Sequence, residues 1–202
     1  MTDPQKIDLE RIAVSGVEAL KRGDHRTART AFEQVAATGR ASVQVWLFLA
    51  QACDMADDRP AAMAAIAKVL ESDPGNAYAL VMGGEIQQRS GDERAAMAWY
   101  DRALAAADGL QLPNDLVARL HRADTARGAL RGRFEAQMMT TLADAGVTTD
   151  AAGPRFAEAI SIVSGRSQPH LQQPTSFYFP RLPQVPFFDP ADFAWARALA
   201  DA

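Results

Sequence analysis

The sequence predicts an all-α fold: a right-handed superhelix of stacked helical hairpins, with capping helices and an extended C-terminal segment. Three observations lead to this prediction. Small residues recur at a fixed interval through the first half of the chain, and turn residues recur in the same register. An amphipathic pattern with three- and four-residue steps follows the repeats. The last part of the chain is instead rich in proline and aromatic residues.

The repeat is clearest at Gly16, Ala50 and Gly84, which lie 34 residues apart. The same interval separates the members of three further sets: Ala28, Ala62 and Ala96; Phe32, Ile66 and Tyr100; and the turns Gly23-Asp24, Asp57-Asp58 and Gly91-Asp92. Each unit is predicted to be a helix, a turn and a second helix. The small residues should let the alanines of the second helix approach closely, and the large residues should reach toward the next unit. One hairpin cannot bury its own apolar face, so neighbouring units should stack.

These units, at residues 9–42, 43–76 and 77–110, resemble tetratricopeptide repeats. Trp46 at the start of the second unit and Pro74 at its end add to the resemblance. In such an array the first helices of successive units line a concave face.

A capping helix is predicted after the repeats, over residues 113–144. Pro113 suits the first turn of a helix, and apolar residues recur behind it at helical spacing. Gly128 and Gly132 interrupt this pattern, which leaves open a bend or two shorter helices. The repeat domain is therefore predicted to span residues 1–145.

The remaining residues, 146–202, differ in composition. A short linker helix is expected from Pro154 to Val163, with its apolar residues on one face. Five prolines then exclude a helix up to Asp189, and the aromatic residues among them favour an extended segment that docks on a surface. Asp189 is a candidate N-cap for a last helix that is still in progress at Ala202.

The run LQQPTSFYFPRLPQVPFFDPADFAWARAL closely resembles the segment that joins repeats to the catalytic domain in bacterial aspartyl/asparaginyl β-hydroxylases. The preceding PRFAEAISIVSGR resembles the linker helix of that family. The resemblance implies an Fe(II)- and 2-oxoglutarate-dependent hydroxylase whose repeats help to position a polypeptide substrate. Its catalytic domain would follow Ala202, so the resemblance assigns no catalytic, cofactor-binding or metal-binding residue to this chain.

The histidines agree with that expectation. Non-haem iron oxygenases commonly hold iron with two histidines and one carboxylate, and a His-x-Asp or His-x-Glu pair is the local sign. The residues two positions after His25, His121 and His170 are Thr27, Ala123 and Gln172. The chain as it stands is expected to have no catalytic activity, whereas the full-length parent would be a dioxygenase.

Composition excludes several other classes of function. The chain has 202 residues, 21 basic and 25 acidic, with a net charge of −4, so it lacks the excess positive charge of nucleic-acid-binding proteins. No apolar run is long enough to cross a membrane, and no secretory signal is seen. We therefore expect a cytoplasmic protein. The single Cys53 excludes an internal disulfide and is expected on the core side of a first helix.

The densest basic stretch comprises the arginines at 119, 122, 127, 131 and 133. On a helix they spread over about half the circumference, and no aromatic residues lie between them. We expect a solvated helix face here, with Arg127 on the apolar side and paired locally.

A candidate partner-binding groove follows from the repeat geometry. Its predicted lining residues are Val14, Val17, Gln44, Leu47, Phe48, Gln51, Tyr78, Met82, Glu85 and Arg89. Most of them are apolar or uncharged, so the groove suits an apolar segment of a protein or peptide. The alternative is that an extra helix or the chain's own tail fills it permanently.

Three hypotheses about function remain. The first is a non-catalytic repeat scaffold and protein-interaction region of an aspartyl/asparaginyl β-hydroxylase, offering the groove to a polypeptide. The second is a stand-alone tetratricopeptide-repeat adaptor that binds a peptide or protein. The third is a homo-oligomer, in which the tail of one copy lies in the groove of another.

Overall fold

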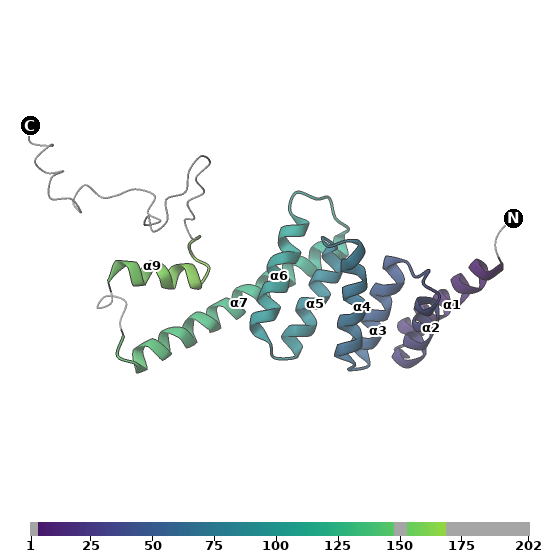
Figure 1. The fold of residues 1–202 in the computed structure, drawn as a ribbon, viewed down its shortest axis with the longest axis horizontal. Coiled ribbons are helices and arrows are strands. Elements are labelled where there is room, and N and C mark those ends of the chain that lie inside the picture. The colour runs from purple at the N-terminus through teal and green to yellow at the C-terminus, as the bar shows by residue number, and fades with distance from the viewer. Residues whose placement is uncertain (1–3, 148–152, 169–202) are drawn as a thin grey trace, which may run out of the picture. The chain divides into compact units, whose positions relative to one another are not determined.

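A computed structural model describes residues 4–147 and 153–168 of the chain. The described residues are helical and contain no strand, which confirms the predicted all-α class (Figure 1). The helices are α1 Pro4–Lys21, α2 His25–Ala37, α3 Val43–Met55, α4 Arg59–Ser72, α5 Ala77–Arg89, α6 Glu93–Ala107, α7 Asn114–Asp144 and α9 Pro154–Val163. The predicted extended segment, the last helix capped by Asp189, and His170 lie outside the described residues.

The chain divides into two compact units, Met1–Arg133 and Phe134–Ala202. In the first unit, consecutive helices pair into three hairpins: α1 with α2, α3 with α4, and α5 with α6. Each helix packs on the next one along the chain, and α3 also contacts the first helices α1 and α5 on either side of it (Figure 1). Such contact between consecutive elements is the stacking expected of a helical-repeat array.

Helices α2 to α6 are each preceded by a polar N-cap residue, and these residues recur with the period of the repeat. Side chains of these residues accept a hydrogen bond from the backbone N–H three positions later, at 2.9–3.3 Å. They are Asp24, Ser42, Asp58, Asn76 and Asp92. Since the first N–H groups of a helix have no partner within it, these caps fix where each helix starts.

The turn inside each hairpin needs one residue in the left-handed conformation. Gly23 and Gly91 have φ of 78° and 81°, and Asp57 takes the equivalent place with φ of 60°. Glycine adopts this conformation without steric cost, whereas in aspartate the Cβ atom makes it less favourable. The three turns therefore share one backbone shape despite the different residue.

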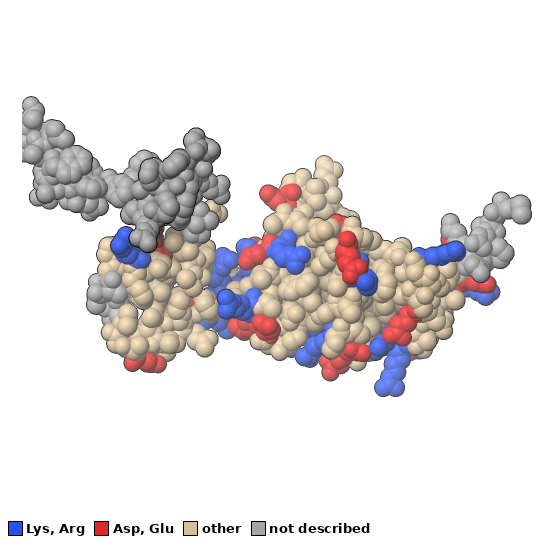
Figure 2. Space-filling view, viewed as in Figure 1, with Lys and Arg blue, Asp and Glu red and all other residues tan. Residues whose placement is uncertain are grey.

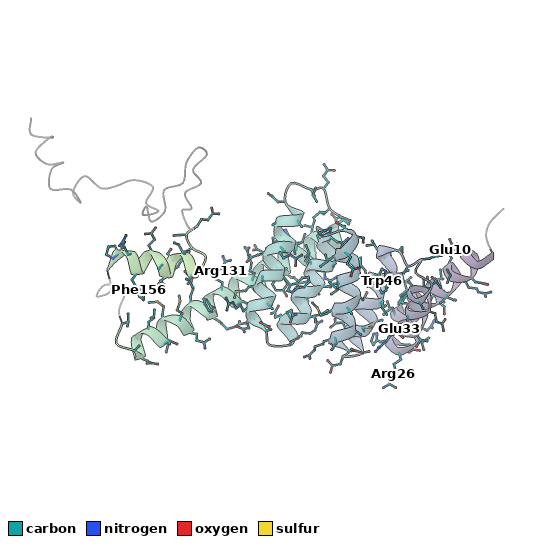
Figure 3. The ribbon with its side chains drawn as sticks, viewed as in Figure 1. Glu10, Arg26, Glu33, Trp46, Arg131 and Phe156 are labelled. Atoms are coloured by element: carbon teal, nitrogen blue, oxygen red, sulfur yellow. The ribbon has the colours of Figure 1, made fainter. Side chains whose placement is uncertain are left out.

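The predicted repeat positions form the core. The three alanines of the second helices are fully buried, and so are the large residues Phe32, Ile66 and Tyr100. Trp46 packs against the same core from α3 and is labelled in Figure 3. Cys53 is 1% exposed, as predicted, and its burial raises the pKa of the thiol. It therefore behaves as a small apolar residue.

The space beside the glycines of the first helices is occupied by aromatic rings. A Cβ atom added at Gly16 would overlap the ring of Phe32, and one at Gly84 would overlap the ring of Tyr100. The aromatic residues thus reach back onto their own hairpin. Phe32 also stacks on Phe48 of the next unit, with ring centroids 5.6 Å apart, so it fulfils the predicted contact as well.

Helix α7 runs without interruption through Gly128 and Gly132. This continuity excludes the alternative of two shorter helices. A Cβ atom at either glycine would meet nothing within 4 Å, so these glycines lie on an open helix surface. Their cost in helix propensity is offset by the packing of Leu116, Leu120 and Leu130, which are buried along the same helix.

In the second unit, α9 spans Pro154–Val163, as expected for the linker helix. It has a proline in its first turn and ends at the buried Ser164, whose hydroxyl donates to the carbonyl of Ile160 at 2.8 Å. Arg166 Nε lies 3.3 Å from Glu135 Oε1 on the last part of α7. This ion pair lies within the second unit.

Candidate functional site

The first helices form a face with a pocket of about 310 Å³. The pocket is lined by Gln44, Leu47, Phe48, Gln51, Tyr78, Met82, Asp115 and Arg119. Six of these belong to the predicted groove, on α3 and α5. The other two come from the start of α7. The structure thus brings together three helices at one concavity of the first unit.

The floor of the pocket is apolar and rigid. Leu47 and Met82 are 9% and 6% exposed, so their side chains are held by the core and present only one surface to the pocket. Phe48 is half-buried, and the stacked ring of Phe32 supports it from behind. A floor of this kind can bury an apolar side chain without reorganising.

The rim is polar. Gln44 and Gln51 are exposed and lie two turns apart on the same face of α3. The Tyr78 hydroxyl donates to Asp115 Oδ2 at 2.8 Å, which ties α5 to α7. This hydrogen bond, together with burial, raises the pKa of Tyr78 above its ordinary value. Tyr78 is therefore neutral at physiological pH.

Both arginines at this face are paired with carboxylates of a neighbouring helix. Arg119 makes a bidentate contact with Glu85, Nε to Oε1 at 2.9 Å and Nη2 to Oε2 at 2.5 Å. Burial opposes the charge on Arg119, but the hydrogen bonds to Glu85 leave its pKa raised overall. Arg89 pairs with Asp54 on α3. Positive charge at this face is thus neutralised from within the chain.

The predicted groove residues do not all meet in the pocket. Val14 and Val17 lie on α1 and are not part of its lining, although Val14 is 57% exposed and Val17 packs against the core. Glu85 and Arg89 are engaged in the two ion pairs, and only Glu85 adjoins the lining through Arg119. The pocket therefore covers only part of the predicted groove, on α3, α5 and the start of α7.

The sequence analysis missed Asp115 and Arg119. They lie 34 residues after Val81 and Glu85, so the start of α7 occupies the place of a first helix in a fourth unit. The sequence analysis treated α7 only as a capping helix, so this 34-residue relation to α5 was not used. Extending the repeat register by one more period would have found both residues.

The basic stretch of α7 is partly exposed, with Arg122 and Arg133 open to solvent, and several of its arginines also pair with carboxylates. Arg127 donates to Asp101 at 2.8 Å and to Asp124 at 2.6 Å, which agrees with its predicted local pairing. Arg133 pairs with Glu93 at 2.7 Å. With Arg119, these residues link α7 to α5 and α6 through ion pairs. Along the array, in the view of Figure 2, basic and acidic side chains lie interspersed rather than in patches of one sign.

Other kinds of site were sought in the described part of the chain. No three or more His, Cys, Asp or Glu side chains there are grouped so that they could hold a metal ion. None of the helices described combines the length and apolar character that a membrane span requires. His25 begins α2, and His121 is exposed on α7.

Comparisons with known proteins address the fold. Residues 19–83 match the tetratricopeptide repeat family. The structure is similar to the TPR2B domain of yeast Sti1 in its complex with pHsp70, with a TM-score of 0.51 and 17% sequence identity. This similarity covers 59% of the present chain and 98% of the Sti1 chain. No curated protein sequence matches the chain. The first unit therefore contains a tetratricopeptide-repeat region.

Proposed function

We propose that this chain is the non-catalytic scaffold of an Fe(II)- and 2-oxoglutarate-dependent aspartyl/asparaginyl β-hydroxylase, and that its pocket receives a polypeptide. The observation that carries the scaffold role is the pocket itself, which three helices build from an apolar floor and a polar rim. Such a surface recognises a polypeptide by burying a side chain and hydrogen-bonding its backbone. The hydroxylase context is supported by the resemblance of residues 153–202 to the segment that precedes the catalytic domain in that family.

Among the described residues, no three or more His, Cys, Asp or Glu side chains are grouped so that they could hold a metal ion. In this proposal the cofactors belong to a separate catalytic domain. The chain contributes binding and orientation of a polypeptide, and no chemical step.

The coding sequence downstream of Ala202 tests the hydroxylase context. We expect an open reading frame that continues into a β-rich, histidine-containing domain of about 150–200 residues. A stop codon directly after Ala202, or a continuation without such a domain, would exclude this parentage. Either result would leave the proposed binding of a polypeptide in the pocket unaffected.

A stand-alone adaptor is the second candidate. It is favoured by the position of the pocket, whose lining comes entirely from the first unit. The compared Sti1 domain is also a repeat domain in a complex. Under this proposal the chain binds a peptide or protein with no catalytic domain attached.

Peptide binding by the 202-residue chain tests the pocket in both cases. Gln51→Arg places a long charged side chain at the rim, at a residue that is already exposed, and should abolish binding without unfolding the protein. Gln137→Arg, at an exposed position of α7 in the second unit, is the matched control. Equal loss of binding in both variants, or in neither, would place the binding site elsewhere.

A further inference from the structure

Arg119 lines the pocket and pairs with Glu85 of α5, whereas Arg89 of α5 lies outside the lining and pairs with Asp54 of α3. Arg119 and Glu85 are 27% and 28% exposed, so their bidentate contact is partly shielded from water. Arg89 pairs with Asp54, whose carboxylate is only 16% exposed. Arginine is the residue best suited to bind a carboxylate of a partner, because its planar fork donates two parallel hydrogen bonds. In Arg119 two such donors, Nε and Nη2, are already used by Glu85.

We propose that the internal ion pair between Arg119 and Glu85 makes the pocket select an uncharged polypeptide segment bearing a Leu, Met or aromatic side chain, and reject segments with a carboxylate. This inference rests on the proposed peptide-binding role of the pocket. The occupant is a segment of a partner protein.

The rejection of carboxylates follows from competition. An incoming carboxylate would have to displace Glu85 from Arg119 and leave it partly buried without a partner, which is costly. The internal carboxylate has the further advantage that it loses no translational freedom when it pairs. Asp115 adds a negative charge at the rim, where it accepts a hydrogen bond from the neutral Tyr78 hydroxyl. An acidic segment would therefore meet repulsion and no free cation within the pocket lining.

The preference for an apolar side chain follows from the floor and the size of the pocket. Leu47, Phe48 and Met82 offer apolar surface and no hydrogen-bonding group at the bottom. A volume of about 310 Å³ is at the lower end of ligand sites, which suits one or two side chains. The amides of Gln44 and Gln51 can each donate and accept a hydrogen bond, so they suit the backbone of the segment.

Selection from a displayed library of random dodecapeptides tests the inference on the full chain. Peptides retained by the wild-type protein should be enriched in Leu, Met and aromatic residues and depleted in Asp and Glu. Glu85→Gln removes the carboxylate that neutralises Arg119, so its selected peptides should gain acidic residues. Glu93→Gln releases Arg133, which lies outside the pocket, and should select the same peptides as the wild type.

Affinity measurements then make the test quantitative. The best wild-type peptide and an analogue with one added Asp are compared by fluorescence anisotropy. Glu85→Gln should bind the acidic analogue about fivefold more tightly than the wild type does, and Glu93→Gln should show no change. Circular dichroism checks that each variant is folded. If Glu85→Gln unfolds, Glu85→Asp replaces it, because the shorter side chain weakens the contact with Arg119.

The outcomes separate this inference from the proposed function. Enrichment of acidic peptides on the wild type, or no gain of acidic peptides in the variant that frees Arg119, would overturn the selectivity and leave peptide binding intact. No enrichment of any peptide over a blank surface would overturn the peptide-binding role itself, and the selectivity with it.

Discussion

The hairpins α3/α4 and α5/α6 share one backbone plan but distribute side-chain volume in opposite ways. In α5/α6 the first helix carries Gly83, and a Cβ atom there would overlap the ring of Trp99 on the second helix. Thirty-four residues earlier, α3/α4 carries Leu49 on the first helix and Ala65 on the second. The large residue therefore lies on the second helix in one hairpin and on the first in the other.

This difference shows what the repeat pattern specifies. A close-packed interface tolerates exchange of large and small residues as long as the total volume is kept. The shared period thus sets which positions meet, whereas the identity of the large partner varies from one hairpin to the next. Each prediction below changes one hairpin or turn so that its counterpart serves as the reference.

The largest effect is expected for Gly84→Leu in α5/α6. Any side chain at this position must displace the buried ring of Tyr100, so overpacking should cost about 1–3 kcal/mol of the free energy of unfolding. Urea denaturation measures this cost.

Gly128→Leu is the control for helix propensity. The space around Gly128 is open, so the same substitution should stabilise the protein, by up to about 1 kcal/mol. If Gly84→Leu changed stability by less than about 0.5 kcal/mol, the contact between Gly84 and Tyr100 would be contradicted.

A double-mutant cycle in α5/α6 tests the exchange of volume directly. Gly83→Leu alone should overpack against Trp99, and Trp99→Ala alone should leave a gap. Together they reproduce the Leu49 and Ala65 arrangement of α3/α4. The double variant should therefore be more stable than the sum of the single changes predicts, by about 1 kcal/mol or more. Additive free energies of unfolding would show that the two positions do not share one space.

The hairpins also differ in a titratable group. Tyr100 of α5/α6 donates its hydroxyl to Gln88 Oε1 at 2.7 Å, whereas the equivalent residue of α3/α4 is Ile66. Burial, followed by the charge of Glu85, raises the pKa of Tyr100 to about 12. Because this pKa exceeds the unfolded value of about 10, Tyr100 contributes stability fully below pH of about 10 and loses it as the pH rises toward 12.

Tyr100→Phe should remove that part of the alkaline pH dependence and cost about 1 kcal/mol at neutral pH. Titration of tyrosinate absorbance should lose its highest transition in this variant, and unfolding at several pH values reports the stability. An unchanged titration curve would show that Tyr100 ionises in its ordinary range.

Much of the fold could be predicted from the sequence because the repeat is local and periodic. Residues 34 apart identify the turns and the buried large positions without knowledge of contacts. The pairing of Gly16 with Phe32 could not be predicted in this way. Spacing shows which helices meet, but it does not show which side chain fills a given gap.

The candidate site was predicted only in part for a related reason. Gln44, Phe48 and Met82 follow from the register of the first helices. The partners Glu85 and Arg119 lie one period apart, so the same register contains them once α7 is included as a fourth first helix. In contrast, Arg127 and Asp101 are 26 residues apart, a separation that no period explains. Such pairs depend on how α7 lies against α6.

The smallest effect is expected from the turns, where Asp57 of α3/α4 corresponds to Gly91 of α5/α6. Asp57 has φ of 60°, and its ion pair with Arg59 is at 3.3 Å between exposed groups, which contributes little. Asp57→Gly should relieve the cost of the left-handed conformation and stabilise the protein by about 0.5 kcal/mol. The reciprocal Gly91→Asp should destabilise it by a similar amount, as measured by urea denaturation. If both substitutions shifted the free energy of unfolding in the same direction, the two turns would not share one backbone conformation. The two hairpins would then be equivalent in their helices but not in their turns.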